Sequence, residues 1–215
     1  MPAAAPTSNL YLVLRAGPAA LDRLTAALAA ATPASLLIKP AAGSILDAQA
    51  VLPLIKLAQS HGVAVLLADD AQLVRTTKAD GVHLTWSKDL AARSAEARDI
   101  LGHRFMLGVD CGRSRHEAME QGEAGAEYVA FGIPDHVEDR ETAAQRREEL
   151  CEWWGAIFEV PCVAFDVDEL EDARRLAELG ADFVAINLPE GLSGADLQAF
   201  VTAAARSLDV HEEMT

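Results

Sequence analysis

The sequence has few of the features that mark a secreted, zinc-binding or membrane-embedded chain. It contains three cysteines, Cys111, Cys151 and Cys162, with neither a CxxC pair nor Cys/His metal spacing, which predicts buried or free thiols instead of disulfides or zinc ligands. No apolar run approaches the roughly 18 residues that a membrane span requires. The start of the chain also lacks the basic and apolar regions of a signal peptide. These absences predict a soluble, cytoplasmic protein.

Basic residues are scarce as well. The chain has 18 Lys and Arg against 33 Asp and Glu, a formal net charge of −15 at pH 7. Such a charge repels nucleic-acid phosphates and anionic lipids, so neither nucleic acid nor a membrane surface is expected as a partner. An anionic small molecule would need local cations, a helix N-terminus or a divalent metal ion to bind here.

One stretch, residues 63–84, shows how the chain is built. It begins with the apolar run VAVLL at 63–67, which is typical of a buried parallel strand. Asp69 and Asp70 follow, then a short helical pattern at 73–77, then a second strand at 82–84. The two carboxylates thus come directly after a strand, where parallel α/β proteins place the groups that bind ligands.

The same unit recurs along the chain. The segments KADGVHL, GAEYVAFG and GADFVAINL each have a small residue and an acid, then one residue and a valine, leading into an apolar strand. Strands are predicted at residues 10–14, 36–39, 63–67, 82–84, 105–109, 128–131, 162–165 and 183–186, and helices at 18–31, 45–60, 73–77, 87–101, 114–124, 141–158, 168–179 and 193–208. This eight-fold alternation favours a single-domain (β/α)8 TIM barrel over an open doubly wound sheet. We expect a lead-in at 1–9, the barrel at 10–208 and a polar tail at 209–215.

Three segments carry a family resemblance: HGVAVLLADDAQLVRTTKADGVHL, FMLGVDCGRSRHEAMEQGEAGAEYVAFG and VPCVAFDVDELEDARRLAELGADFVAI. Over nearly its whole length the chain resembles the thiamine phosphate synthase family, which also contains a thiazole tautomerase branch. The resemblance implies a TIM barrel and a transferase of thiamine biosynthesis. Its substrates would be hydroxymethylpyrimidine pyrophosphate and thiazole phosphate, joined with loss of pyrophosphate and with Mg²⁺ bound.

The resemblance also implies metal ligands. The family's Asn-Asp-Arg motif stands here as Ala68-Asp69-Asp70, so Asp69 keeps the metal-binding position. The nearest counterpart of the second metal carboxylate is Asp89, if one residue is inserted. Magnesium commonly takes one or two carboxylates and completes its shell with phosphate oxygens and water. For Asp69, a helix cap or first-turn acid is an equally good interpretation, and for Asp70 and Asp89 it is the better one.

Four further residues match phosphate-contacting or reactive positions by resemblance. Lys39 and Arg140 are the candidate catalytic cations at the pyrophosphate, where positive charge stabilises the leaving group. Asp110 takes the place of a serine that contacts pyrophosphate, and His136 lies in the mobile sixth loop as a candidate substrate contact, acid or base. The alternatives are a solvated lysine, an arginine paired with neighbouring acids, and an exposed loop histidine.

The chain departs from the family pattern after its last two strands. A phosphate-binding Gly-Gly pair is replaced by the acidic stretch 166–169, in which Asp168 has capping-box spacing to Glu171. A family serine after the eighth strand is Leu188 here. Two functions therefore stay open: the synthase reaction, or a non-synthase barrel that acts as a binding or regulatory protein or catalyses a changed reaction such as thiazole tautomerisation.

Two other features have a structural and a functional interpretation. His83 lies within a predicted strand, so we expect a structural role for it. The adjacent pair Trp153-Trp154 lies on an outer helix. It could form a contact between subunits of a homo-oligomer, or one indole could pack on the barrel while the other stays partly exposed.

Overall fold

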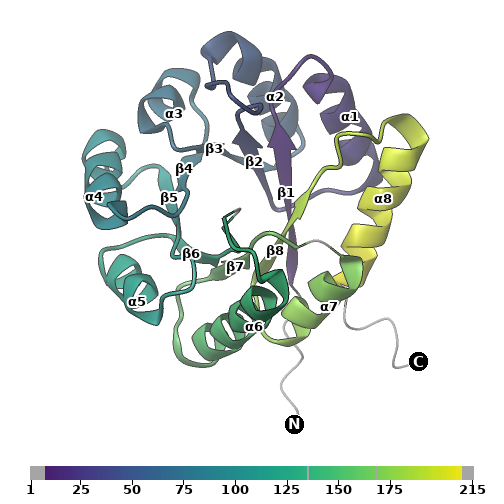
Figure 1. Cartoon of the computed structure of the whole chain (residues 1–215). Helices are drawn as coiled ribbons and strands as arrows, with labels where there is room; N and C mark the ends of the chain where they lie inside the picture. The colour runs from purple at the N-terminus through teal and green to yellow at the C-terminus, as the bar shows by residue number, and fades with distance from the viewer. Residues whose placement is uncertain (1–7, 135, 168, 210–215) are drawn as a thin grey trace.

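A computed structural model describes residues 8–134, 136–167 and 169–209. In this part of the chain, eight parallel strands close into a barrel in the order β1 to β8, with eight helices around it (Figure 1). The predicted (β/α)8 barrel is therefore confirmed. The strands are β1 (Asn9–Arg15), β2 (Ser35–Lys39), β3 (Ala64–Ala68), β4 (Gly81–Leu84), β5 (Met106–Asp110), β6 (Tyr128–Phe131), β7 (Cys162–Ala164) and β8 (Phe183–Asn187). The helices are α1 (Ala20–Ala30), α2 (Ala48–Ser60), α3 (Ala71–Thr77), α4 (Leu90–Leu101), α5 (Arg115–Glu123), α6 (Arg140–Ile157), α7 (Leu170–Glu178) and α8 (Gly194–Ser207).

The apolar runs become strands because both of their faces are buried. Leu12, Leu36 and Val65 face the helices and belong to the large core between the barrel and its outer ring. Alternate residues such as Val13 and Leu37 point inward and fill the barrel with a second, smaller core. This arrangement accounts for strands that read as continuous apolar sequence instead of alternating with polar residues.

The predicted start of the second helix at residue 45 is wrong. Helix α2 begins at Ala48, because the extended Asp47 caps it by accepting hydrogen bonds from the N–H groups of Gln49 and Ala50 at 2.8 and 3.0 Å. Ile45 is left 87% exposed in the preceding loop. Its apolar side chain fits the helical period, but a capping carboxylate two residues later sets the boundary.

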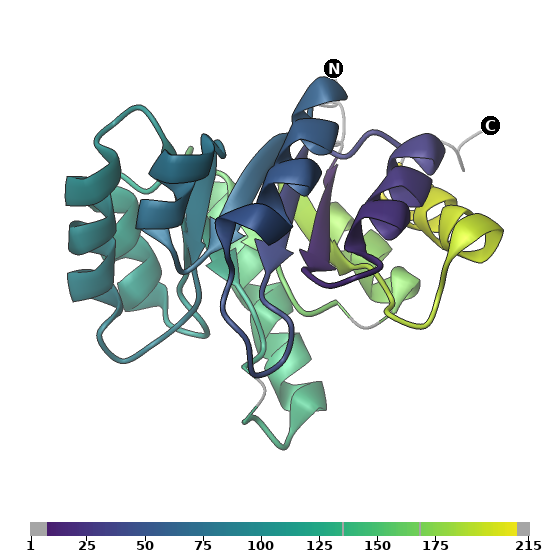
Figure 2. The ribbon, with the colours of Figure 1, turned by 90° about the horizontal axis from the view of Figure 1, so that it is seen from above.

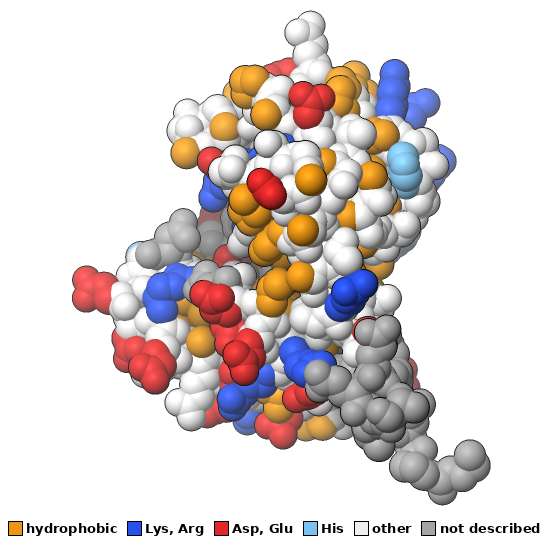
Figure 3. All heavy atoms as spheres, turned by 90° about the vertical axis from the view of Figure 1, so that its right-hand side faces the viewer, with side chains coloured by type: hydrophobic (Ala, Val, Ile, Leu, Met, Phe, Trp, Pro, Cys, Tyr) orange, Lys and Arg blue, Asp and Glu red, His pale blue; other side chains and the backbone are white. Residues whose placement is uncertain are grey.

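The loops that follow the strands gather at one end of the barrel. In Figure 2 the strands point downward, and the β2–α2 loop and the first part of α6 project furthest past their carboxyl ends. Acidic side chains crowd the projecting region in Figure 3, and Glu138, Asp139 and Glu141 are exposed at the start of α6. The mouth of the barrel is therefore framed by an acidic rim.

The structure shows where the three cysteines and the tryptophan pair lie. The three cysteines are free and buried, as predicted. Trp154 is 1% exposed, and its indole N–H donates to the carbonyl of Val160 at 2.6 Å. Trp153 is half-buried and lies under the Arg115 guanidinium at 4.6 Å from the ring centre. Among the helices that the structure describes, none combines the length and apolar character needed to cross a bilayer.

Candidate active site at the mouth of the barrel

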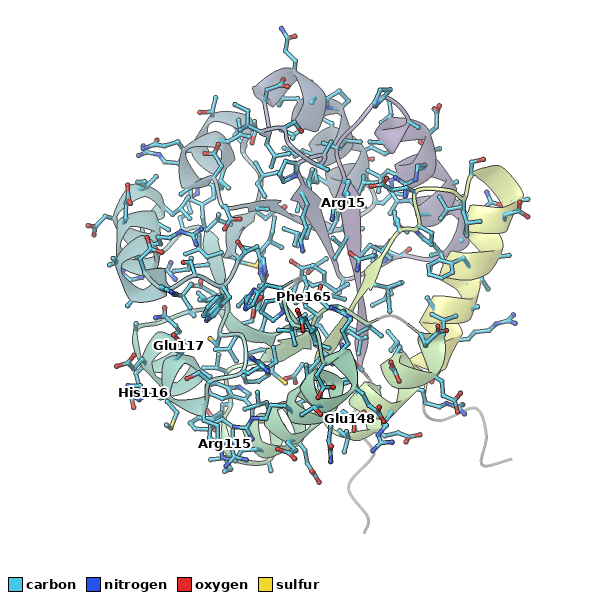
Figure 4. The ribbon with its side chains drawn as sticks, viewed as in Figure 1. Arg15, Arg115, His116, Glu117, Glu148 and Phe165 are labelled. Carbon is cyan, nitrogen blue, oxygen red and sulfur yellow. The ribbon has the colours of Figure 1, made fainter. Side chains whose placement is uncertain are left out.

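A chain of buried hydrogen bonds lies in the barrel interior below the mouth. Nδ1 of His83 is 2.8 Å from the hydroxyl of Tyr128, which is 3.1 Å from the hydroxyl of Tyr11. Gly108 makes room for this arrangement, because a Cβ there would overlap the Tyr128 ring. His83 also stacks on Phe165 with ring centres 4.6 Å apart, and Figure 4 shows Phe165 near the barrel axis.

The protonation of this histidine follows from its surroundings. Burial and, to a smaller extent, the positive charge of Lys39 lower the pKa of His83 to about 3, while the negative charge of Asp69 opposes the shift. The imidazole is therefore neutral at physiological pH. A neutral, hydrogen-bonded and stacked histidine supports the packing of the barrel interior, as the sequence predicted.

Above this network, two carboxylates converge on Gly132, which follows β6; Asp110 comes from the end of β5 and Asp166 from the loop after β7, on either side of it. A Cβ at Gly132 would lie 2.7 Å from Oδ2 of Asp166 and 3.1 Å from Oδ2 of Asp110. The Asp166 carboxylate accepts a hydrogen bond from the Ile133 N–H at 2.8 Å, and Asp110 accepts one from the Gly112 N–H at 2.8 Å. The absent side chain of Gly132 thus lets both carboxylates approach one point at the end of β6.

The surroundings of Asp110 change its acidity. Burial raises the pKa of Asp110 to about 7, and the negative charge of Asp166 adds to the rise. The Gly112 N–H, the positive charge of Lys39 and the Gly132 N–H oppose it. A carboxyl group with this pKa exchanges a proton near neutral pH, a property common among acid–base groups in enzymes.

A buried arginine fixes the backbone that carries one of these carboxylates. Arg147, on α6 and 1% exposed, donates from Nη1 to the carbonyls of Phe165 and Asp166 at 2.9 and 2.6 Å. Asp166 itself has a left-handed backbone conformation with φ 56°, which aspartate adopts more readily than most residues. The acidic loop after β7 is therefore held in place from the outside of the barrel.

A cavity of about 360 Å³ opens beside this pair at the ends of β1, β2 and β8. Three cations line it, Arg15, Lys39 and Arg140, together with two acids, Asp166 and Glu190. Arg15 lies 3.5 Å from Glu190 in an exposed ion pair, and the ammonium of Lys39 lies 5.6 Å from the centre of the Phe165 ring. The structure thus brings both predicted catalytic cations to one cavity that can accept an anion.

Asp69 lies at the end of β3 but is not the cap of the next helix. Its carboxylate accepts hydrogen bonds from the Thr85 N–H and hydroxyl, both at 2.8 Å, and from Nη2 of Arg93 at 2.6 Å. The cap of α3 is Asp70, which accepts the Leu73 N–H at 2.8 Å. The interpretation of Asp69 as an N-cap is therefore wrong, and that of Asp70 as a helix-terminal acid is confirmed.

These residues do not fit a magnesium site as they stand. Both oxygens of Asp69 already accept hydrogen bonds from Arg93 or Thr85. Asp89 is fully exposed at the start of α4; a hydrogen bond from Ser87 and, to a smaller extent, the charge of Arg93 lower its pKa. The Arg93 guanidinium therefore occupies the side of the Asp69 carboxylate that a metal ion would have to bind. No group of three or more His, Cys, Asp and Glu side chains in the described ranges is placed to hold a metal ion.

His136 lies beside Trp86 at the mouth of the barrel. Its exposed ring is 6.0 Å from that of Trp86, centre to centre. Trp86 in turn covers Gly112, where a Cβ would lie 2.9 Å from the indole. His136 therefore belongs to the aromatic side of the mouth, and Lys39 and Arg140 to its ionic side.

Comparison with known proteins agrees with the barrel fold. Residues 10–187 match the family model described as thiamine monophosphate synthase. The chain belongs to this family. A thiamine-phosphate synthase of Erythrobacter litoralis is 42% identical over 152 residues, which cover 69% of this chain and 70% of the relative. One of Hyphomonas neptunium is 40% identical over 131 residues, covering 61% of this chain but only 58% of the relative, less than two thirds of its length.

A solved structure of the same family name has a similar fold. Thiamine phosphate pyrophosphorylase from Pyrococcus furiosus superposes with a TM-score of 0.73 and 18% identity, covering 94% of this chain and 96% of that one. At this identity the likeness shows the fold alone. Family membership thus rests on the sequence matches, and the chemistry of the mouth on its own residues.

Sequence reasoning missed part of this site. Asp166 entered the sequence analysis only as part of an acidic stretch that replaces a glycine pair, although, like Asp69, it is an acid directly after a predicted strand. Arg15 directly follows the first predicted strand as well, but it was not singled out. Arg93 and Arg147 reach the mouth from helices, and no local pattern in the sequence shows which loop a helical arginine will contact. Asp168, with its expected capping box, lies outside the described residues.

Proposed function

We propose that this protein binds a small phosphorylated molecule of thiamine biosynthesis in the cavity between β8, β1 and β2, and that it does so without magnesium. The observation that carries the proposal is the placement of Arg15, Lys39 and Arg140 around one cavity at the carboxyl ends of the strands. TIM-barrel enzymes bind their substrates at this end, and guanidinium groups suit the geometry of phosphate.

Independence from magnesium follows from the neighbouring carboxylate. Arg93 and Thr85 hold Asp69 in hydrogen bonds, so a metal ion would have to displace a guanidinium at 2.6 Å. Binding of the phosphorylated ligand therefore depends on the cations of the cavity. The protein would bind such a ligand and act on it by a reaction other than the synthase displacement.

The synthase reaction is the second candidate. It is favoured by the shared cavity of Lys39 and Arg140, the two positions that the reaction would use to stabilise departing pyrophosphate. In that case Asp69 and Asp89 would hold Mg²⁺ after Arg93 moves away. The first candidate thus predicts that the ligand binds with or without magnesium, and the second that pyrophosphate binding requires it.

Calorimetric titration with thiamine phosphate and with pyrophosphate, each with and without Mg²⁺, tests the proposal. We expect binding in both conditions, weakened at least about tenfold by Lys39→Ala or Arg140→Ala because each removes a charge-assisted contact. Arg104→Ala is the matched control, since this exposed arginine precedes β5 at the opposite end of the barrel.

Two other outcomes have definite meanings. Magnesium-dependent pyrophosphate binding that Asp69→Ala abolishes, together with formation of thiamine phosphate from the two family substrates, would establish the synthase reaction. Absence of binding by either ligand in millimolar solution would overturn the proposal and leave a barrel without a phosphate site.

A further inference from the structure

We propose that Glu190 is an internal competitor for the anion cavity: its carboxylate pairs with the Arg15 guanidinium and has to leave it when a small anion binds. Glu190 therefore sets the affinity of the cavity for anions. For the existence of the anion site this inference rests on the proposed function. The competition at Arg15 is an additional claim, which can fail while the anion site stands.

Glu190 and Arg15 reach the cavity from neighbouring strands. Arg15 is the last residue of β1 (Figure 4), and β1 pairs with β8, which Glu190 follows. The Glu190 carboxylate lies 3.5 Å from Nε of Arg15. Both side chains line the cavity together with Lys39 and Arg140. A carboxylate of the protein itself is thus placed against a cation that an anionic ligand would use.

Glu190 combines a held backbone with an exposed side chain. At the base of its loop, the carbonyl of Leu188 accepts a hydrogen bond from Nη2 of the buried Arg23 at 2.7 Å. Beyond it, the Leu192 N–H donates to the carbonyl of Pro189 at 3.3 Å and closes the turn that carries Glu190. The Glu190 side chain is 70% exposed, so rotation about its own bonds is enough to move the carboxylate into solvent.

The charges around the cavity show what this movement achieves. Three cations and two acids line the cavity, a formal net charge of +1. When Glu190 turns away, the lining has a charge of +2 as the anion enters. Asp166 is less able to move, because its carboxylate accepts the Ile133 N–H at 2.8 Å and Arg147 holds its carbonyl. Glu190 is therefore the acid of this cavity that can give way.

The competition is weak enough to be reversible. The side chains of Arg15 and Glu190 are 49% and 70% exposed, and water and salt screen ion pairs of this kind. An anion in the cavity also meets Lys39 and Arg140, so it displaces the carboxylate instead of being excluded by it. We expect Glu190 to lower the affinity for a small dianion about three- to tenfold without abolishing binding.

Calorimetric titration of the wild type and Glu190→Gln with sulfate at low ionic strength tests the competition. Glutamine keeps the size of the side chain and removes its charge, so the affinity should rise about three- to tenfold. Glu138→Gln is the matched control, since Glu138 is an exposed acid of the rim before α6, and it should change the affinity less than about twofold. Equal affinities of the wild type and Glu190→Gln would overturn the inference and leave the anion site in place. Absence of sulfate binding by both proteins would overturn the inference and the anion site together.

A double-mutant cycle separates competition at Arg15 from a general effect of negative charge. In the Arg15→Gln background, Glu190→Gln should change the sulfate affinity less than about twofold, because the guanidinium for which the two anions compete is gone. Lys39 and Arg140 still line the cavity in this background. An increase as large as that in the presence of Arg15 would show that Glu190 acts through its charge alone, and would contradict its role as a competitor for Arg15.

Discussion

At the scale of single residues, each acid that follows a strand is defined by the donors around it. Asp69 accepts hydrogen bonds from a guanidinium and a hydroxyl, Asp70 caps a helix, and the half-buried Asp110 lies beside another carboxylate. The sequence alone does not show which donors surround each of these acids. Their chemistry differs because the first is neutralised, the second is used by the backbone, and the third keeps an exchangeable proton.

The acidity of Asp110 predicts a pH-dependent cost to stability. Its folded pKa of about 7 lies above the ordinary value of 3.8. The folded state therefore holds the proton more tightly, and stability is lost as pH rises from about 4 to about 7. Asp110→Asn should raise the free energy of unfolding by about 2 to 4 kcal/mol at pH 8 and leave it nearly unchanged near pH 3.5. Urea unfolding at the two pH values measures this, and an equal effect at both would refute it.

The hydrogen bonds of Asp69 predict a structural cost that magnesium does not change. Asp69→Asn removes the ion pair with Arg93 and weakens the contacts with Thr85, so we expect a loss of about 1 to 2 kcal/mol, limited by solvent screening of a partly exposed pair. Asp70→Asn is the control and should be near neutral, because asparagine caps helices as well as aspartate. If Mg²⁺ raises the melting temperature of the wild type but not of Asp69→Asn, the carboxylate is a metal ligand after all.

At the scale of elements, the strands could be predicted because burial on both faces leaves an unbroken apolar run. The eight-fold order follows from their alternation with helices. The ends of the helices were harder to predict than the strands. Ile45 fits the apolar spacing of the second helix, but Asp47 caps the helix and makes it begin at Ala48. The site could be predicted where its residues match motif positions at the ends of strands, as Lys39 and Asp110 do. Contacts from a helix to a loop, such as those of Arg93 and Arg147, depend on packing that the sequence does not state.

The link from α6 to the β7 loop gives a prediction at this scale. Arg147→Lys should destabilise the fold by about 2 to 3 kcal/mol, because the lysine ammonium ends one bond short of Nη1, which donates to both carbonyls of the loop. Loosening this loop should also move Asp166 and shift the carboxyl titration of Asp110 to lower pH. The neighbouring Arg146→Lys is a matched control, since Arg146 is a surface residue paired with Glu149 at 2.9 Å. Thermal unfolding and the aspartate titration measure both effects, and equal behaviour of the two variants would count against the link.

At the scale of the whole molecule, the chain has a net charge of −15, yet cations line the cavity at the mouth of the barrel. The acidic start of α6 lies outside the cavity, while Arg15, Lys39 and Arg140 lie within it. Under the proposed function, the net charge discourages polyanions from approaching, and the local cations bind the small anion that enters the cavity. This division explains how a strongly acidic chain can belong to a family whose relatives are named for a phosphorylated product.

Assembly is the remaining property at this scale, and the tryptophan pair allows a test. Trp154 is buried in its own subunit, and the Trp153 ring is covered by Arg115 and packs against Phe158 with ring centres 5.3 Å apart. We therefore expect Trp153→Ala to leave the mass in solution unchanged while lowering stability by about 1 to 2 kcal/mol through lost ring contacts. Light scattering coupled to gel filtration gives the mass. Ile157→Ser, on the same helix and 63% exposed, is the companion variant. A lower mass for Trp153→Ala alone would place the indole in a subunit interface, whereas a lower mass for Ile157→Ser alone would place the interface on the exposed side of α6.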